Sequence, residues 1–191
     1  MKEFLVDYLD NFAKFSDEEK KSIMELIQLN NFKKGDILLE SGKKTKNSYL
    51  VIKGCLRSYY IVDGEERTTE FFTEEDIITP VCSGDNSPSK YNIVCLEDSV
   101  LLVSNPELEA IGFSKFPQFE MLCRVMSEKA FTQKQHEFDS FKISNPEERY
   151  KQLLLDRPQL IQRVPQYQIA SYLGIMPQSL SRLRKRLVTN K

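Results

Sequence analysis

The chain has few of the residues that build metal or catalytic centres. Its only histidine is His136, and its four cysteines are far apart with no CxxC pair: Cys55, Cys82, Cys95 and Cys123. A zinc ribbon or clustered iron–sulfur site needs closely spaced cysteines, and a catalytic triad would depend on His136 alone. We therefore expect no catalytic residue, no metal and no cofactor. The cysteines are expected to be small buried hydrophobes, with redox sensing by one of them as the alternative.

Long apolar runs are also missing. No stretch approaches the ~20 consecutive apolar residues of a membrane span. The N-terminal sequence MKEFLVDYLDNF is charged and amphipathic, unlike a signal peptide. These features predict a cytoplasmic protein without a membrane partner.

Acidic residues are absent after Asp156, whereas seven basic residues follow it. The whole chain has a net charge of −1, so the segment from Arg157 onward carries +7 and the preceding part carries −8. An acidic body joined to a basic segment indicates a polyanionic partner, with an ordinary solvated surface as the alternative.

The middle of the chain predicts short strands. Residues 32–42, 47–62 and 67–81 are rich in β-branched and aromatic side chains. Asp63-Gly64 has the composition of a type I′ hairpin turn, which needs positive φ at both central residues. Residues 91–104 predict two strands about Glu97-Asp98, after a polar loop at 82–90. Short strands at regular spacing, separated by glycine-containing turns, are typical of a sandwich, jelly roll or barrel.

Helical patterns flank the strands. Ser16 and Glu19 have capping-box spacing, and a long helix is predicted from the region of Phe116 to about residue 140. Met121 and Val125 widen the apolar face of this helix, so it needs a partner beyond its own domain: either the β domain and the C-terminal segment both cover it, or two copies pair along it. Asn145-Pro146 then starts a shorter helix over 146–156.

The sequence QIASYLGIMPQSLSRLRKRL predicts a helix-turn-helix. Ala170, Gly174 and Leu180 occupy positions 5, 9 and 15 of the motif counted from Gln166. A small residue permits close helix crossing, and glycine permits positive φ in the turn. Ile169, Leu173, Leu180 and Leu183 are expected to face inward.

The outward residues of the second helix, 177–187, suit DNA. For base contacts we select Gln178, Ser181 and Arg182, because glutamine can read adenine and arginine can pair with guanine. Phosphate or orienting contacts are assigned to Ser179, Arg184, Lys185 and Arg186. Met176 is a poor cap and leaves the first backbone amides of the second helix without a side-chain acceptor. A DNA phosphate could also be their partner.

The chain resembles the Crp/Fnr transcriptional regulators. The GD-x-L-x-x-x-G entry, YLVIKG and DGEER resemble that family's cyclic-nucleotide-binding-type β-roll, and residues 146–187 resemble its DNA-binding domain. The resemblance implies an α+β protein with a jelly-roll-like sensor domain (1–113), a dimerisation helix (114–140) and a helix-turn-helix domain (141–191). It also implies a homodimer on a palindromic operator in double-stranded DNA, with RNA polymerase and an unidentified small-molecule effector as further partners.

The resemblance places the effector pocket at Thr79, Ser89 and Lys90. Members that bind cyclic AMP have a Gly-Glu pair for the ribose and an Arg-Ser or Arg-Thr pair for the phosphate. Here the carboxylate and the bidentate cation are missing, so we expect no cyclic AMP binding in the usual mode. Family members also carry a β-hairpin wing, which here must be missing or must lie around Gln162 to Pro165.

Two other classes of protein remain to be compared. A jelly-roll metal enzyme would need histidines on its strands, and the strands contain none. The second alternative is an effector-binding or protein-interaction module that has lost sequence-specific DNA binding. The array of Gln178, Ser181 and Arg182 favours a DNA-binding regulator over that module.

Overall fold

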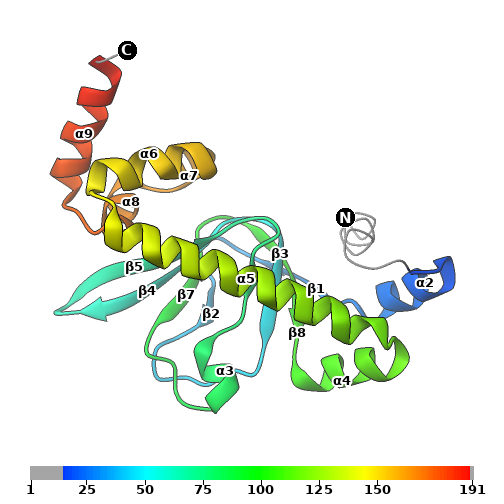
Figure 1. The fold of residues 1–191 in the computed structure, drawn as a ribbon. Helices are drawn as coiled ribbons and strands as arrows, with labels where there is room; N and C mark the ends of the chain where they lie inside the picture. Colours follow the sequence, from blue (N-terminus) through cyan, green and yellow to red (C-terminus); the bar gives the residue numbers. More distant parts are fainter. Residues whose placement is uncertain (1–14, 190–191) are drawn as a thin grey trace.

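The computed structural model describes residues 15–189, which form a β domain, a long helix and a small helical domain (Figure 1). The N-terminal sequence MKEFLVDYLDNF and Lys191 lie outside these residues. Helix α2 (Asp17–Leu26) begins at the predicted capping box, in which the Ser16 hydroxyl accepts from the Glu19 amide and the Glu19 carboxylate accepts from the Ser16 amide. Within the described range, no helix is both long enough and apolar enough to cross a bilayer.

The β domain consists of two antiparallel sheets of four strands. The first has the order β1 (Leu29–Phe32), β8 (Ser99–Ser104), β3 (Ser48–Lys53) and β6 (Ile77–Ile78). The second has the order β2 (Ile37–Leu39), β7 (Asn92–Cys95), β4 (Leu56–Val62) and β5 (Glu65–Phe72). Side chains from both sheets, among them Val51, Leu56, Ile93 and Leu101, pack into one buried core. The predicted β-roll is confirmed.

The Asp63-Gly64 turn joins β4 to β5 as predicted. Val62 pairs with Glu65 across the turn, and Asp63 and Gly64 have φ values of 53° and 79°. Positive φ at both central residues is the requirement of a type I′ turn. β7 and β8 also flank Glu97-Asp98, but they belong to different sheets. This second turn therefore carries the chain from one sheet to the other.

Two short helices were not predicted. α3 (Val81–Asp85) lies partly in the predicted loop at 82–90. α7 (Leu160–Arg163) lies between the helix that ends at Asp156 and the helix that begins at Gln166. Helices of five and four residues are too short to show a 3.6-residue period in sequence. Of the two alternatives for a β-hairpin wing, its placement around 162–165 is excluded, because α7 occupies part of that range and the described residues 141–189 contain no strand.

The remaining helices follow β8. They are α4 (Pro106–Lys115), α5 (Gln118–Ile143), α6 (Pro146–Asp156), α8 (Gln166–Tyr172) and α9 (Pro177–Thr189). α5 continues beyond the predicted end near residue 140 and stops before Asn145. The Asn145 side chain caps α6 by accepting from the amides of Glu147 and Glu148.

Helix α5 runs along the roll and connects it to the C-terminal helices (Figure 1). Near its start, Phe119 and Met126 pack in a cluster with Ile23 of α2 and Phe116. On another side, Met121, Phe131 and Phe138 are 63%, 71% and 59% exposed. The described part of the chain therefore leaves apolar surface on α5 uncovered.

Candidate nucleic-acid interface

α8 and α9 are joined by the tight turn that the motif predicted. Gly174 has a φ of +70°, a conformation that L side chains adopt only with strain. The Ile175 amide donates to the Ala170 carbonyl at 3.0 Å, which closes the end of α8. Arg149 of α6 donates to the Leu173 carbonyl at 3.0 Å, and this bond connects the turn to α6.

A small core holds the two helices together. Ile169, Ala170, Leu173 and Leu180 are each at most 2% exposed, and Leu183 is 8% exposed. They pack in one cluster with residues of α6 and α7, including Tyr150, Leu153 and Leu160. Ala170 is fully buried at the crossing, where a larger side chain would separate the helices. The inward face predicted from sequence is confirmed.

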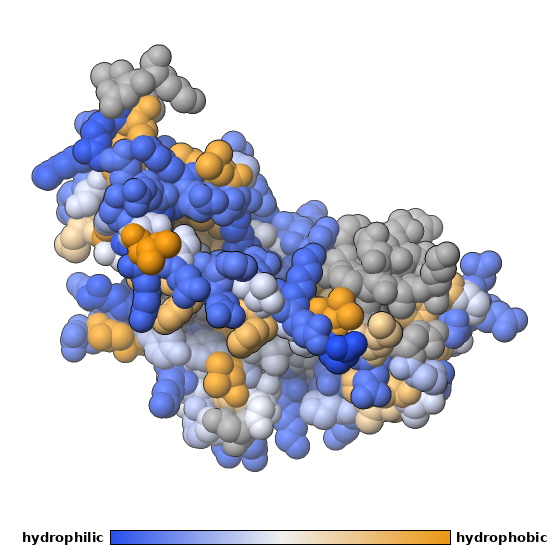
Figure 2. Space-filling view, viewed as in Figure 1, coloured by the Kyte–Doolittle hydropathy of each residue, from blue (hydrophilic) through white to orange (hydrophobic). Residues whose placement is uncertain are grey.

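The residues assigned to base contact lie together on the opposite face of α9. Gln178, Ser181 and Arg182 are all exposed, and none of them has a side-chain hydrogen bond or ion pair with another described residue. Most of the visible surface of the C-terminal helices is hydrophilic (Figure 2). This face is available to a partner with hydrogen-bonding groups.

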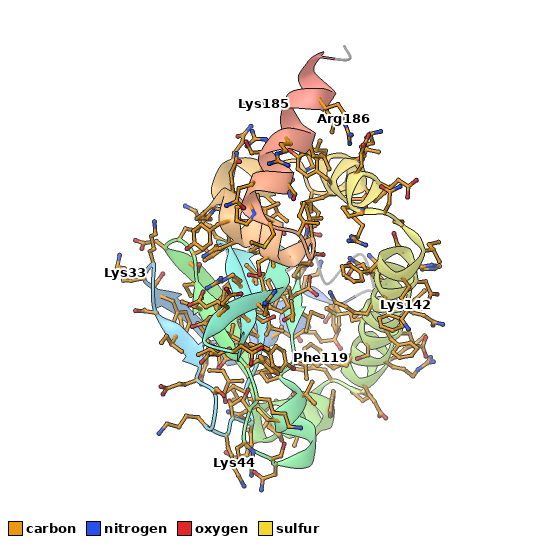
Figure 3. The ribbon with its side chains drawn as sticks, turned by 90° about the vertical axis from the view of Figure 1, so that its left-hand side faces the viewer. Lys33, Lys44, Phe119, Lys142, Lys185 and Arg186 are labelled. Atoms are coloured by element: carbon orange, nitrogen blue, oxygen red, sulfur yellow. The ribbon has the colours of Figure 1, made fainter. Side chains whose placement is uncertain are left out.

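The phosphate-contact candidates differ in their surroundings. Ser179 and Lys185 are exposed, and Arg184 is half-buried. Lys185 and Arg186 project from the distal part of α9, away from the roll (Figure 3). Arg186 pairs with Glu147 of α6. The pKa of Glu147 is lowered by a hydrogen bond from Lys151 and by the charge of Arg186. Of the four candidates, Arg186 is therefore the one whose ion pair with Glu147 orients α9 against α6.

The start of α9 has the weak cap that the sequence indicated. Met176 is 66% exposed, and its carbonyl accepts the first bonds of the helix from Ser179 at 2.9 Å and Leu180 at 3.2 Å. A thioether is a poor acceptor for the Gln178 amide, so that donor is left to the solvent side.

Arg157, which the charge count assigned to a polyanion-binding segment, faces the roll. It donates to the Phe71 carbonyl at 2.9 Å and to the Thr73 hydroxyl at 3.0 Å, and it forms an ion pair with Asp76. Its side chain is 18% exposed. Its charge is therefore neutralised within the protein.

Arg163 also faces the roll. It donates to both oxygens of Glu74, at 2.8 and 2.9 Å, and to both oxygens of Glu97, at 2.6 and 3.4 Å. Burial would raise the pKa of Glu74, but the bonds from Arg163 and the Gly54 amide outweigh burial and lower the pKa to about 2. Arg157 and Arg163 were counted in the +7 segment expected to meet a polyanion. Both instead bind acidic side chains of the roll, so they do not contribute to that surface.

Helix α8 rests directly on strand β5. The Ser171 hydroxyl accepts from the Thr68 amide at 2.9 Å and donates to the Glu66 carbonyl at 3.2 Å. The rings of Phe71 and Tyr172 lie 5.3 Å apart in the same cluster as the C-terminal core. The helix-turn-helix is therefore held against the β-roll, a contact that sequence reasoning missed because its partners are about a hundred residues apart.

A charged junction connects the roll, the long helix and the C-terminal domain. Lys134 of α5 pairs with Glu70 of β5 and with Glu137, and Arg157 lies 3.8 Å from Glu70. Burial raises the pKa of Glu70, although the charge of Lys134 opposes the effect. The sequence carries no local signal for this junction, since opposite charges far apart in a chain have many possible partners.

The effector-pocket candidates are not brought to a common point. Ser89 is buried and its hydroxyl donates to the Tyr91 carbonyl at 2.7 Å, so it stabilises its own loop. Lys90 is exposed. Thr79 is exposed and lines a cavity on the outer side of the first sheet, whose lining includes neither Ser89 nor Lys90.

The arrangement defines a class of fold: a β-roll joined by a long helix to a C-terminal domain that ends in two helices with a helix-turn-helix geometry. A family model of the cyclic nucleotide-binding domain matches residues 29–108. A comparison with curated proteins finds no match.

Solved structures share the fold over most of the chain. FixK2 from Bradyrhizobium japonicum has a TM-score of 0.70 at 16% identity, covering 86% of this chain and 85% of its own. CLP from Xanthomonas campestris, named as a c-di-GMP-responsive global regulator, has a TM-score of 0.68 at 13% identity, covering 92% and 93%. The catabolite activator protein of Thermus thermophilus has a TM-score of 0.55 at 18% identity, covering 94% and 86%. Residues 29–108 thus resemble a cyclic nucleotide-binding domain, and the chain shares the fold of these Crp/Fnr-type structures, in agreement with the resemblance found in the sequence.

Proposed function

We propose that this chain is a transcriptional regulator that binds a palindromic operator as a homodimer through α9. The observation that carries the proposal is the exposed face of Gln178, Ser181 and Arg182 on a helix whose opposite face is buried in a small core. Two such faces related by a two-fold axis match the two half-sites of an operator. The exposed apolar residues of α5 support pairing of two copies along that helix.

The other parts of the proposal follow from the same class. We place the protein in the cytoplasm and assign the roll (1–113), the dimerisation helix (114–140) and the helix-turn-helix domain (141–191) to sensing, pairing and DNA binding. RNA polymerase is the partner through which such a regulator would act. Ser179, Arg184 and Lys185 are assigned to phosphates, and a phosphate at the start of α9 would satisfy the Gln178 amide.

The test starts with operator selection from random duplexes, followed by fluorescence anisotropy. Arg182→Ala should weaken operator binding by ~1–3 kcal/mol per half-site and relax specificity at one base pair. Lys185→Ala should weaken binding to all sequences and reduce the salt slope by about one. Arg67→Ala is the matched control, because Arg67 is an exposed arginine of the roll whose side chain is 58% exposed.

Two results would contradict the proposal. If Arg182→Ala and Gln178→Ala both bind the selected operator as tightly as the parent chain, the reading face is wrong. If the parent chain shows no salt-dependent retention on DNA, the alternative gains support: an effector-binding or protein-interaction module that has lost sequence-specific DNA binding.

A further inference from the structure

A cavity of about 390 Å³ lies between the first sheet and helices α2, α4 and α5. Leu50 of β3 and Leu102 of β8 form its floor on the side of the sheet that faces away from the roll core. Phe113 and Phe119 line it from α4 and α5, and Phe119 points between the long helix and the sheets (Figure 3). Cavities of ~300–1,000 Å³ are the size that small-molecule sites occupy.

One end of the cavity carries an oriented carboxylate. Ser48 and Ser104 are directly opposite each other on β3 and β8. Both hydroxyls donate to Oε1 of Glu109, at 3.2 and 3.3 Å. Two donors on one oxygen fix the direction of the carboxylate and leave its second oxygen for another donor.

No basic side chain among the described lining residues balances the carboxylate of Glu109 at this end of the cavity. Among the described lining residues Glu109 is the one acidic side chain, and there is no lysine, arginine or histidine. Burial, and next the negative charge of Glu109, raise the pKa of the Cys123 thiol on the α5 side. The field of the carboxylate therefore extends across the cavity, and the complementary ligand is a cation with an apolar body.

We propose that this cavity binds a small apolar amine, with its ammonium group on Glu109 and its hydrocarbon body between Leu50, Leu102 and Phe119. The ammonium group supplies the missing donor and the opposite charge, and the apolar body removes aliphatic and aromatic surface from water. Because α4 and α5 both line the cavity, an occupant would stabilise the seating of the long helix on the roll. Binding of the amine does not depend on the proposed function; only an effect of the bound amine on DNA binding rests on it.

The test is calorimetric titration of the full chain, without DNA, with three probes of equal length: phenylbutylamine, phenylbutanol and phenylbutyrate. The amine should bind about tenfold more tightly than the alcohol, because both can donate a hydrogen bond to the Glu109 carboxylate but only the ammonium group adds the attraction of an opposite charge. The carboxylate probe should bind weakest, because its charge repels Glu109. Since DNA is absent, the result does not depend on whether the chain is a regulator.

Two test variants and one control variant localise the binding. Glu109→Gln should abolish the tenfold preference for the amine, while Glu107→Gln, the same change at an exposed position of the same helix, should keep it. Gly112→Leu should fill the cavity and abolish binding of all probes. A Cβ at Gly112 meets the Phe119 ring at an ordinary 3.5 Å, so the first carbon of the new side chain does not clash. Thermal unfolding of each variant verifies that it folds.

A chemical readout addresses the same site. Cys123 lines the cavity, so the amine should slow its alkylation as measured by peptide mass mapping. The proposal is overturned if amine and alcohol bind equally to the parent chain, or if Glu109→Gln retains the preference. Failure of all three probes to bind would also overturn it, and would point to a protein segment, residues 1–14 or a second copy, as the occupant.

Discussion

The ion pair between Arg163 and Glu74 can be tested by Glu74→Gln, which removes one charge and keeps the shape of the side chain. A pKa lowered from 4.5 to about 2 corresponds to ~3 kcal/mol if no solvent screened the pair. The Glu74 side chain is 39% exposed, and pairs of that exposure lose much of their ideal value, so we expect about 1–2 kcal/mol. Glu75→Gln is the matched control, because Glu75 is the neighbouring exposed carboxylate.

The pH dependence of this loss has a definite sign. A carboxylate whose pKa is lower in the folded chain stabilises the fold above its unfolded pKa near 4.5, and the stabilisation disappears as pH falls toward 2. The free energy of unfolding, measured by urea titration at pH 7 and at intervals down to about pH 3.5, should show a gap between Glu74→Gln and the parent chain that narrows with acidity. Equal stability at pH 7, or a gap that stays constant with pH, would refute the reasoning.

Two further substitutions test other parts of the structure. Gly174→Ala places a Cβ at a φ of +70°, which should cost about 1 kcal/mol and lower the thermal midpoint, whereas Gly84→Ala, at an exposed glycine without positive φ, should lower it less. Lys134→Met removes the cation beside Glu70, whose pKa is already raised by burial, and should raise that pKa further. Because a raised carboxylate pKa destabilises the fold as pH increases, this variant should lose stability relative to the parent chain as pH rises above the ordinary carboxylate range, and a pH-independent loss in urea titration would contradict the assignment.

Local features of the fold were readable in the sequence. Asp63-Gly64 specified a type I′ turn, and Ser16 and Asn145 specified helix starts, because each feature depends on residues within four positions of one another. The helix-turn-helix was predicted for the same reason: Gly174 and the buried leucines of α9 follow a fixed short spacing. The short helices α3 and α7 were missed, since neither contains two full turns of apolar periodicity.

The charge count illustrates a limit of composition. Seven basic residues with no acidic residue among them predicted a polyanion-binding segment. Arg157 and Arg163 instead meet Asp76 and Glu74, which lie 81 and 89 positions earlier in the chain. Net charge is a sum over residues, whereas neutralisation depends on which side chains the fold brings within hydrogen-bonding distance.

The sequence by itself determined the type and order of the longer elements, the turn at Gly174 and the polar face of α9, because these depend on backbone preferences and periodicity over a few residues. Only the tertiary structure decided that α8 rests on β5 through Ser171, that Lys134 and Glu70 share a junction, and that Glu109 closes a cavity with Ser48 and Ser104. Those contacts join residues whose separation along the chain says nothing about their distance in space, so packing of the sheets and helices is what sets them.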